Sequence, residues 1–440
     1  MALTDRAPTL DRVTRDALPP GSRLPGPLQS LLFVGARTWI IPRWHRRYGD
    51  VFSANLAPAA GHAVVLARPE HIREVFAGPA STFHAGEGNA ILGPIMGEHS
   101  VLLLDEDAHL AARKRVMSAF HGEAIRGWGE VVEGLAAEQV ASWPVGTPFA
   151  VHPLMNEISL EVILRIVFGV TDDTRLTELR PLVRRLVRIG PVVLLGWLYP
   201  RLEAVGPWRR HRQLKMATDE LIYAEITDRR TVPDLDQRSD VLSRLLVADP
   251  TQSDAELRDH LVTLLLAGHE TTATTLAWTL HDLARRPDVQ RRVQRAVDDG
   301  DEHYLEATVK ESMRLRPVIA HVARRLTEPV RVGGYDLPAG VIAFPSIYLV
   351  QHTAAIYPSP DEFRPERFLD GTPPPATWIP FGGGIRRCLG AALAMVEAQA
   401  VLKAVLARVD IEPVGRPEFS RTRNVTTVPG RGARIISRPR

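Results

Sequence analysis

The chain contains a single cysteine, Cys388, and the residues around it suit a thiolate that binds a flat, anionic group. Glycines at positions 382–384 permit backbone conformations and close approaches that a β-carbon would block. Two arginines directly precede the sulfur, and nearby positive charge lowers the pKa of a thiol. The apolar stretch from Ala391 predicts a helix whose N-terminal dipole would favour the thiolate further. A buried structural cysteine is the alternative interpretation.

This segment resembles the haem-binding signature of the cytochrome P450 family. The matching positions are Pro380, Phe381, Gly384, Arg386, Cys388 and Gly390. The resemblance implies that Cys388 is the axial ligand of the iron in haem b (iron protoporphyrin IX), where thiolate donation favours O–O cleavage. It also implies that Phe381 packs beside the sulfur and that Arg386 pairs with a haem propionate. Backbone N–H groups after the cysteine would donate hydrogen bonds to the thiolate.

Three further residues match positions that bind haem propionates in this family. His109 and Arg113 lie four residues apart, which places them on one face of a helix. Alone, this pair indicates only a solvated helix face. Arg324 matches a second propionate-binding arginine, and its neighbour Arg325 is a rival for the same role. Together with Arg386, these residues would neutralise two carboxylates in a buried pocket, as buried anions require.

An acid and an alcohol, Glu270 and Thr271, stand side by side in an otherwise apolar stretch. Because burying an unpaired carboxylate is costly, the acid needs a partner or a purpose. One interpretation is a bent helix, with the threonine hydroxyl bonded to an earlier carbonyl. The other is a proton relay at an oxygen site.

The stretch from Ala267 to Thr271 resembles the oxygen-activation motif of the P450 family. In that motif the threonine stabilises bound dioxygen and the acid supports proton delivery. The resemblance implies that Ala267 and Gly268 let haem and oxygen approach the backbone. His269 lies at a variable position of the motif, so we expect it to be structural or substrate-facing and not an iron ligand.

Glu311 and Arg314 lie three residues apart, so they share one face of a predicted helix and can pair. Most such pairs are exposed and contribute little to stability. Here the spacing resembles the Glu-x-x-Arg helix of the P450 family, whose pair joins a downstream arginine and holds the cysteine loop. Arg367 matches that third member. We expect all three residues to support the structure and none to do chemistry.

The position of the substrate pocket follows only from the resemblance. The residues expected to line it are Phe83, Ile91, Leu92, Ile95, Met96, Leu264, Val318, Val322 and Val425, and the stretch 188–202 is expected to contribute as well. An apolar pocket with few charges suits a lipophilic substrate, such as a fatty acid, terpenoid, steroid or polyketide. The alternative is that many of these residues belong to the core.

The whole chain of 440 residues carries a net charge of only +3, which argues against a nucleic-acid binder. No linker or repeat divides it, so we expect residues 1–440 to form one domain with an extended, Pro-rich segment at residues 1–27. The expected fold is mainly α with small β-sheets. By resemblance it is the cytochrome P450 fold, with haem between a long central helix and the helix that follows the cysteine loop.

The hydrophobic pattern predicts these elements in outline. Helices are expected over 107–120, 131–142, 155–168, 209–227, 254–285, 306–315 and from Cys388 to about 409, and strands over 51–56, 63–67 and within 330–344. Ser253 and Glu256 predict a capping box at the start of the long helix. No apolar run is long enough to span a bilayer or resembles a signal peptide, so a cytoplasmic monomer without a membrane anchor is expected.

The resemblance implies a monooxygenase that uses O2 and two electrons supplied from outside. NAD(P)H would act indirectly, through a ferredoxin and a ferredoxin reductase on separate chains. Lys114, Arg115, Lys310 and Arg387 are expected to form part of a basic docking face. A peroxide-using or rearranging P450 and a non-catalytic haem protein for sensing or electron transfer are the alternatives, and Glu270 with Thr271 argues against both.

Overall fold

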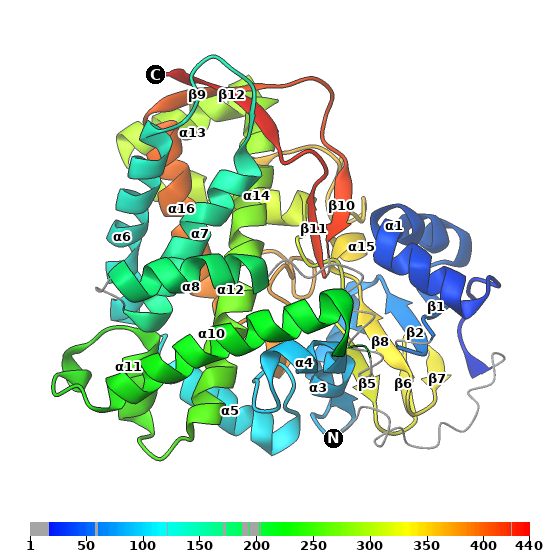
Figure 1. Ribbon diagram of the computed structural model, residues 1–440. Helices are drawn as coiled ribbons and strands as arrows, with labels where there is room; N and C mark the ends of the chain where they lie inside the picture. Colours follow the sequence, from blue (N-terminus) through cyan, green and yellow to red (C-terminus); the bar gives the residue numbers. More distant parts are fainter. Residues whose placement is uncertain are drawn as a thin grey trace.

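The computed structural model describes residues 17–57, 60–120, 122–169, 173–186, 193, 202, 204–423 and 425–440. Figure 1 shows a large helical part and a smaller part, rich in strands, at one side. The helices are α1 (Gly26–Tyr48), α2 (Pro69–Ala77), α3 (Ala85–Gly88), α4 (Gly93–Met96), α5 (Glu106–Ser118), α6 (Gly122–Ala141), α7 (Val151–Phe168), α8 (Asp173–Leu186), α10 (Gly206–Arg230), α11 (Val241–Ala248), α12 (Asp254–Ala284), α13 (Pro287–Asp299), α14 (Glu302–Leu315), α15 (Ile347–Gln351) and α16 (Ala391–Leu406).

The strands form small sheets that fold against the helices. They are β1 (Val51–Asn55), β2 (His62–Leu66), β3 (Phe83–His84), β4 (Phe149–Ala150), β5 (Arg324–Leu326), β6 (Val330–Val332), β7 (Tyr335–Leu337), β8 (Ile342–Pro345), β9 (Val409–Pro413), β10 (Ser420–Arg423), β11 (Thr426–Pro429) and β12 (Arg434–Pro439). The largest sheet has the order β1-β2-β8-β5-β3, in which only β2 and β8 pair in parallel. A second sheet has the order β4-β12-β9, and β6-β7 and β10-β11 are hairpins.

Helix α12 runs through the middle of the helical part (Figure 1). It begins at the predicted capping box, in which the Ser253 hydroxyl accepts from the Glu256 N–H and the Glu256 side chain accepts in return from the Ser253 N–H. The helix packs against α7, α14 and α16, and most of its side chains are buried. Burial is interrupted in the middle, where Ala267 is exposed and Thr271 is half-buried. The central helix therefore opens onto a space at one place, and that place is the acid–alcohol stretch.

The start of the described chain departs from the prediction. An extended segment was expected to reach residue 27, but α1 begins at Gly26 and continues to Tyr48. Pro27 lies in the first turn, where its missing N–H would have no helical partner, so proline there is compatible with a helix. The helix survives a second proline, Pro42, and bends at Ala36, whose backbone is not helical. Residues 17–25 are not α-helical, so only the last two residues of the expected extended segment fall within the helix.

In the part of the chain that the structure describes, no helix has both the length and the apolar character to cross a bilayer.

Candidate functional site

The cysteine loop is held in a shape that requires glycine. Gly382 and Gly384 have φ angles of 66° and 63°, in the left-handed region that other residues rarely adopt. A β-carbon on Gly384 would also lie 2.2 Å from the carbonyl oxygen of Phe76 in α2. The loop closes where the Cys388 N–H donates to the Phe381 carbonyl at 2.9 Å. The glycines thus let the loop pack tightly on α2 and present the sulfur.

The environment of Cys388 differs in one respect from the expectation. The residue is accessible to solvent, yet enough protein surrounds its sulfur that burial raises the pKa of the thiol. The Gly390 N–H, Arg387 and Arg113 act in the opposite direction and are outweighed. In the chain without a metal ion, the pKa of the thiol therefore lies above its ordinary value, although the arginines lower it as expected. A bound metal ion would reverse this balance, because a coordinating thiol is deprotonated outright.

Cationic groups gather beside the loop. Arg386 and His109 lie near Arg324 and Arg113, since their charges act on one another. Arg386 donates to Asp105 at 2.5 Å and to the Leu104 carbonyl at 2.6 Å. Among the described residues no other carboxylate shifts the pKa of Arg324 or Arg386.

Two members of this group show that a counter-charge is needed. Arg324 is 6% exposed and its guanidinium donates to the neighbouring Ala323 carbonyl. Burial, and then Arg386, lower its pKa to about 10. His109 is 1% exposed, its Nδ1 is buried without a hydrogen-bond partner, and burial lowers its pKa to about 4. An arrangement of this kind fits a cofactor that brings its own carboxylates.

The geometry also separates Arg324 from its neighbour. Successive side chains of a strand point to opposite faces, so only one of the two can join the cationic group. Arg325 donates to the Gly340 carbonyl at 2.8 Å and lies 3.8 Å from Glu87. Arg324 is the one whose charge interacts with Arg386.

On α12, the alcohol and the alanine share the open face. The Thr271 hydroxyl donates to the Ala267 carbonyl at 2.7 Å, one helical turn earlier. Gly268 points elsewhere, because a β-carbon there would lie 2.8 Å from Cδ1 of Ile163 in α7. Its small size is explained by the close packing of α12 on α7, and its expected place beside the cofactor stays a prediction. His269 is buried, and its Nε2 lies 3.1 Å from the Asn156 carbonyl.

Glu270 turns away from that face toward the C-terminal hairpin. It is 7% exposed, and Oε1 lies 3.2 Å from Nε of Arg423 in β10. Burial raises the pKa of Glu270, and Arg423 and Thr426 oppose the rise. Sequence reasoning did not find Arg423, because nothing near it in the chain marks it as a partner of a distant helix. A buried acid without a local cation was the one signal that a partner must exist.

The predicted support network forms around Glu311. Nε and Nη2 of Arg314 donate to the two Glu311 oxygens at 2.7 and 2.9 Å, and both side chains are fully buried. Arg367, in the short 3₁₀ turn Pro365–Phe368, lies 3.4 Å from the same carboxylate. The Arg364 N–H donates to it at 2.8 Å. The carboxylate thus receives hydrogen bonds and charge from two segments, α14 itself and the 3₁₀ turn with its preceding residue Arg364.

This network continues to the cysteine loop. Arg314 donates to the Gln351 carbonyl at 2.9 Å, and the Gln351 side chain accepts from the Ile379 N–H at 3.0 Å. Just after Ile379 the loop begins, and the Trp378 ring meets Phe381 edge-on with centroids 6.0 Å apart. The network therefore anchors the segment that leads into the cysteine loop.

The expected pocket residues divide into groups. Leu92, Ile95 and Met96 form one apolar cluster, and the described residues that pack with them include Leu186 of α8, Leu214 of α10 and Leu266 of α12. This cluster lies next to the open part of α12, since Leu266 directly precedes Ala267. Ile91 is half-buried in the 3₁₀ turn Ala90–Leu92.

Other expected pocket residues lie in the core or at the surface. Phe83 pairs with Leu326 between β3 and β5 and, with Val322, packs into the core of the five-stranded sheet. Leu264 belongs to the main helical core, and Val318 is 8% exposed. Val425, at the turn of the β10-β11 hairpin, is 47% exposed. Phe83, Val322 and Leu264 thus pack against the two apolar cores, and their place in the pocket stays a prediction. Most of the stretch 188–202 lies outside the described residues.

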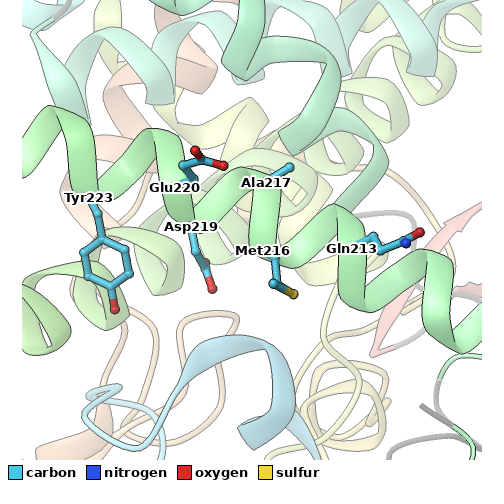
Figure 2. Close-up of a pocket in the computed structure, with 6 residues that line it drawn as sticks. All are labelled: Gln213, Met216, Ala217, Asp219, Glu220 and Tyr223. Atoms are coloured by element: carbon cyan, nitrogen blue, oxygen red, sulfur yellow. The ribbon is translucent and has the colours of Figure 1, made fainter. Parts of the chain in front are cut away.

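A hollow of about 520 Å³ lies on the surface of α10 (Figure 2). It is lined by Gln213, Met216, Ala217, Asp219, Glu220 and Tyr223. None of these residues belongs to the cysteine loop, the cationic group or the open face of α12. The groups that could do chemistry therefore do not line this hollow, and it has no part in the candidate site.

The cysteine loop, the cationic group and the open helix face together have the features of a site for haem bound through cysteine. The family model of cytochrome P450 matches residues 19–433. A Mycobacterium tuberculosis protein with the provisional name cytochrome P450 135A1 is 47% identical over 426 residues, which cover 95% of this chain and 94% of that protein. Cytochrome P450 135B1 of Mycobacterium bovis, also named provisionally, is 45% identical over 430 residues, with 95% and 91% covered.

Among solved structures, retinoic acid-bound cyanobacterial CYP120A1 superposes with a TM-score of 0.85 over 96% of this chain and 99% of that one. At 22% identity this likeness shows the fold alone. The chain therefore belongs to the cytochrome P450 family, and the family and fold predicted from the sequence are confirmed.

Proposed function

We propose that this protein is a haem-thiolate monooxygenase that hydroxylates or otherwise oxidises a lipophilic small molecule. The observation that carries the proposal is a glycine-built loop with an accessible cysteine beside the buried cation Arg324 and the buried His109, whose Nδ1 has no hydrogen-bond partner among the described residues. Haem b bound there would supply O2 binding and O–O cleavage, with two electrons delivered from outside. Membership of the P450 family supports this class of reaction.

Each residue of the site has a defined task in this proposal. Cys388 binds the iron, and the Gly390 N–H donates to the sulfur and so favours the thiolate. His109, Arg113, Arg324 and Arg386 bind the two propionates. Phe381 covers the sulfur through its contact with Trp378. Ala267 leaves room on the open face of α12.

Thr271 and Glu270 control protons. The Thr271 hydroxyl donates its hydrogen bond to the Ala267 carbonyl, so its oxygen can accept a hydrogen bond on the open face. Glu270 sits one residue away, in a buried position where its raised pKa brings it closer to neutral pH. That is the condition under which a carboxyl group can both give and take a proton.

The substrate proposal rests on the apolar cluster next to α12. Leu92, Ile95, Met96 and Leu266 offer no charge, which suits a lipophilic molecule. CYP120A1, which shares the fold, is described as bound to retinoic acid, a lipophilic molecule. For electrons we propose a ferredoxin and an NAD(P)H-dependent reductase on separate chains. We further propose one domain and a monomer in the cytoplasm.

The test combines a spectrum with a reaction. The reduced protein under CO should show the red-shifted Soret band of a thiolate ligand, and Cys388→His should lose it. With NADPH, a ferredoxin and its reductase, the wild type should oxidise apolar compounds that shift its haem band. Retention of the band by Cys388→His would refute the assignment of the ligand. Electron transfer without any oxygenated product would favour a sensor or an electron carrier instead.

A further inference from the structure

Helix α1 carries an apolar stripe that no described residue covers. Its members are Leu24, Leu28, Leu31, Val34 and Trp39, with exposed fractions of 41%, 41%, 68%, 43% and 54%. Leu28, Leu31 and Val34 follow one another at intervals of three residues, which places them along one face of the helix. Leu24 lies just before α1, and Trp39 lies just beyond the bend at Ala36. We call these five residues the α1 stripe. Large apolar side chains exposed together in this way mark a surface that contacts something apolar.

The opposite face of α1 is fixed to the protein. Ile40, Ile41 and Trp44 are buried against β1 and β2, in a separate apolar core. Arg37 donates to the Thr426 carbonyl at 2.9 Å and is 8% exposed. Figure 1 shows α1 at the outer edge of the molecule, beyond β1 and β2. The stripe is therefore held in place on the outside of a rigid element.

The charged residues around the α1 stripe indicate the kind of surface that it would contact. Residues 17–49 contain no aspartate or glutamate. Arg23, Arg43, Arg46 and Arg47 are exposed at the two ends of the stripe. The Arg43 guanidinium lies 4.0 Å from the centre of the Trp39 ring, so the two side chains form a cation–π contact. Aliphatic residues flanked by tryptophan and arginine match the boundary between acyl chains and anionic headgroups.

We propose that the α1 stripe and its flanking arginines bind peripherally to the surface of an anionic lipid bilayer. The side chains of leucine and valine enter the acyl boundary, Trp39 lies at the level of the headgroups, and the arginines contact phosphates. Because a convex helix edge presents no groove, a flat and deformable partner fits it better than the surface of a folded protein. This binding is independent of the proposed reaction and would bring the protein to where lipophilic molecules collect.

Flotation with vesicles tests the proposal on the full-length haem-loaded protein. Vesicles of phosphatidylcholine mixed with phosphatidylglycerol should carry the protein upward, and vesicles of phosphatidylcholine alone should do so far less. Leu28→Ser with Leu31→Ser should weaken binding roughly tenfold or more, because apolar carbons leave the acyl boundary. Arg46→Gln with Arg47→Gln should weaken it by a similar factor and reduce its dependence on salt.

A matched control separates the stripe from apolar exposure in general. Val145 and Val247 are 61% and 50% exposed on other elements, and Val145→Ser with Val247→Ser should leave vesicle binding unchanged. Brominated lipids should quench Trp39 fluorescence, and Trp39→Phe should remove that part of the quenching. Unchanged haem content in every variant shows that the fold is intact.

Three results would overturn the proposal. The first is no binding to anionic vesicles, and the second is binding that the stripe variants leave unchanged. The third is association of two copies without lipid, or capture of an acidic protein, that depends on the stripe while vesicles are ignored.

Discussion

At the scale of single residues, Arg423 influences the pKa of Glu270, the acid of the proposed relay. Burial raises the pKa of Glu270 and Arg423 opposes that rise, so removal of the cation should raise the pKa further. Arg423→Ala should therefore move the protonation midpoint of Glu270 to higher pH, and Arg423→Lys should return it most of the way to the wild-type value. The carboxyl stretching band in infrared difference spectra measures the midpoint directly.

Glu270→Gln is the reference for this experiment, because it removes the band that reports on the acid. It should also slow turnover by about a hundredfold, since an amide cannot transfer the proton. The pH at which turnover falls should move with the infrared midpoint in Arg423→Ala. If the midpoint stays where it is, the 3.2 Å contact has no influence on the relay.

Thr271 is the second residue whose loss has a specific signature. Thr271→Ala should bind haem and substrate as the wild type does, because its hydroxyl bonds only within the helix. Without the hydroxyl oxygen, the proton relay loses a hydrogen-bond acceptor and protons should be delivered to the wrong position. The variant should therefore consume NADPH while it forms several-fold more hydrogen peroxide and less product. NADPH, peroxide and product are measured in the same reaction. Thr271→Ser is the control that keeps the hydroxyl. Wild-type coupling in Thr271→Ala would mean that the hydroxyl only shapes the helix.

At the scale of elements, Glu311 joins α14 to the segment before the cysteine loop. Glu311→Ala leaves Arg314 fully buried without its partner, which costs about 3–5 kcal/mol. Low expression and loss of haem are the expected results, measured by thermal unfolding and by haem content. Glu311→Gln keeps the shape of the side chain but not its charge, so its thermal stability and haem content should lie between those of the wild type and Glu311→Ala. A folded, haem-replete and inactive Glu311→Ala would show a catalytic role instead.

Glu397 links α16, the helix after the cysteine loop, to α7. The Ser159 hydroxyl donates to it at 2.5 Å, and burial raises the pKa of Glu397 from 4.5 to about 8. Between these pH values the folded protein keeps a proton that the unfolded chain has lost, so stability falls as pH rises through the window. Glu397→Gln should remove this dependence and stabilise the protein above pH 8 by on the order of 3 kcal/mol.

Urea unfolding of both proteins at a series of pH values checks this prediction. Below pH 4.5 the two should differ little, because the carboxyl is protonated in both states. Ser159→Ala leaves Glu397 buried without its donor, so it should destabilise the fold at every pH and most strongly at high pH. Parallel curves for the wild type and Glu397→Gln would show that the carboxyl does not titrate in this window.

The elements also show where reading the sequence succeeds. The long helix with its capping box and the Glu311–Arg314 pair were found, because their signals lie within a few residues of one another. Helix α1 was not predicted, and its prolines at positions 27 and 42 weaken the helical signal of that stretch. Phe83 packs into the core of the five-stranded sheet, and residue type alone does not distinguish a sheet core from a cavity wall. Arg423 was missed because its contact with α12 exists only in the folded chain.

At the scale of the whole molecule, the site draws on segments that are far apart in the sequence. The cationic group takes His109 from α5, Arg324 from β5 and Arg386 from the cysteine loop. No one of these segments would hold its charge in a buried place by itself. His109 is neutral at neutral pH, and Arg386 is paired with Asp105. The positive charge that a doubly anionic cofactor would neutralise therefore lies mainly on Arg324 and Arg113. We expect the protein without haem to be less stable for this reason.

The proposed ferredoxin would approach from the side of the cysteine loop, and the structure narrows the basic face expected there. Lys114 and Arg387 are exposed, whereas Arg115 lies 3.8 Å from Glu256 and Lys310 lies 2.8 Å from Glu306. Cations already paired with acids contribute less to docking than free ones. Lys114→Glu with Arg387→Gln should thus raise the KM for ferredoxin roughly fivefold with a smaller change in kcat.

The dependence on salt provides the decisive measurement for this docking face. Attraction between an acidic ferredoxin and exposed cations is screened by salt, so the KM of the wild type should rise steeply with ionic strength. In the variant the slope should be flatter, because fewer charges remain to be screened. Arg331→Glu changes an exposed charge on β6 and should leave both KM and slope unchanged. If that control weakens binding as much as the variant, attraction depends on net charge alone, and Lys114 and Arg387 do not define the place where the ferredoxin docks.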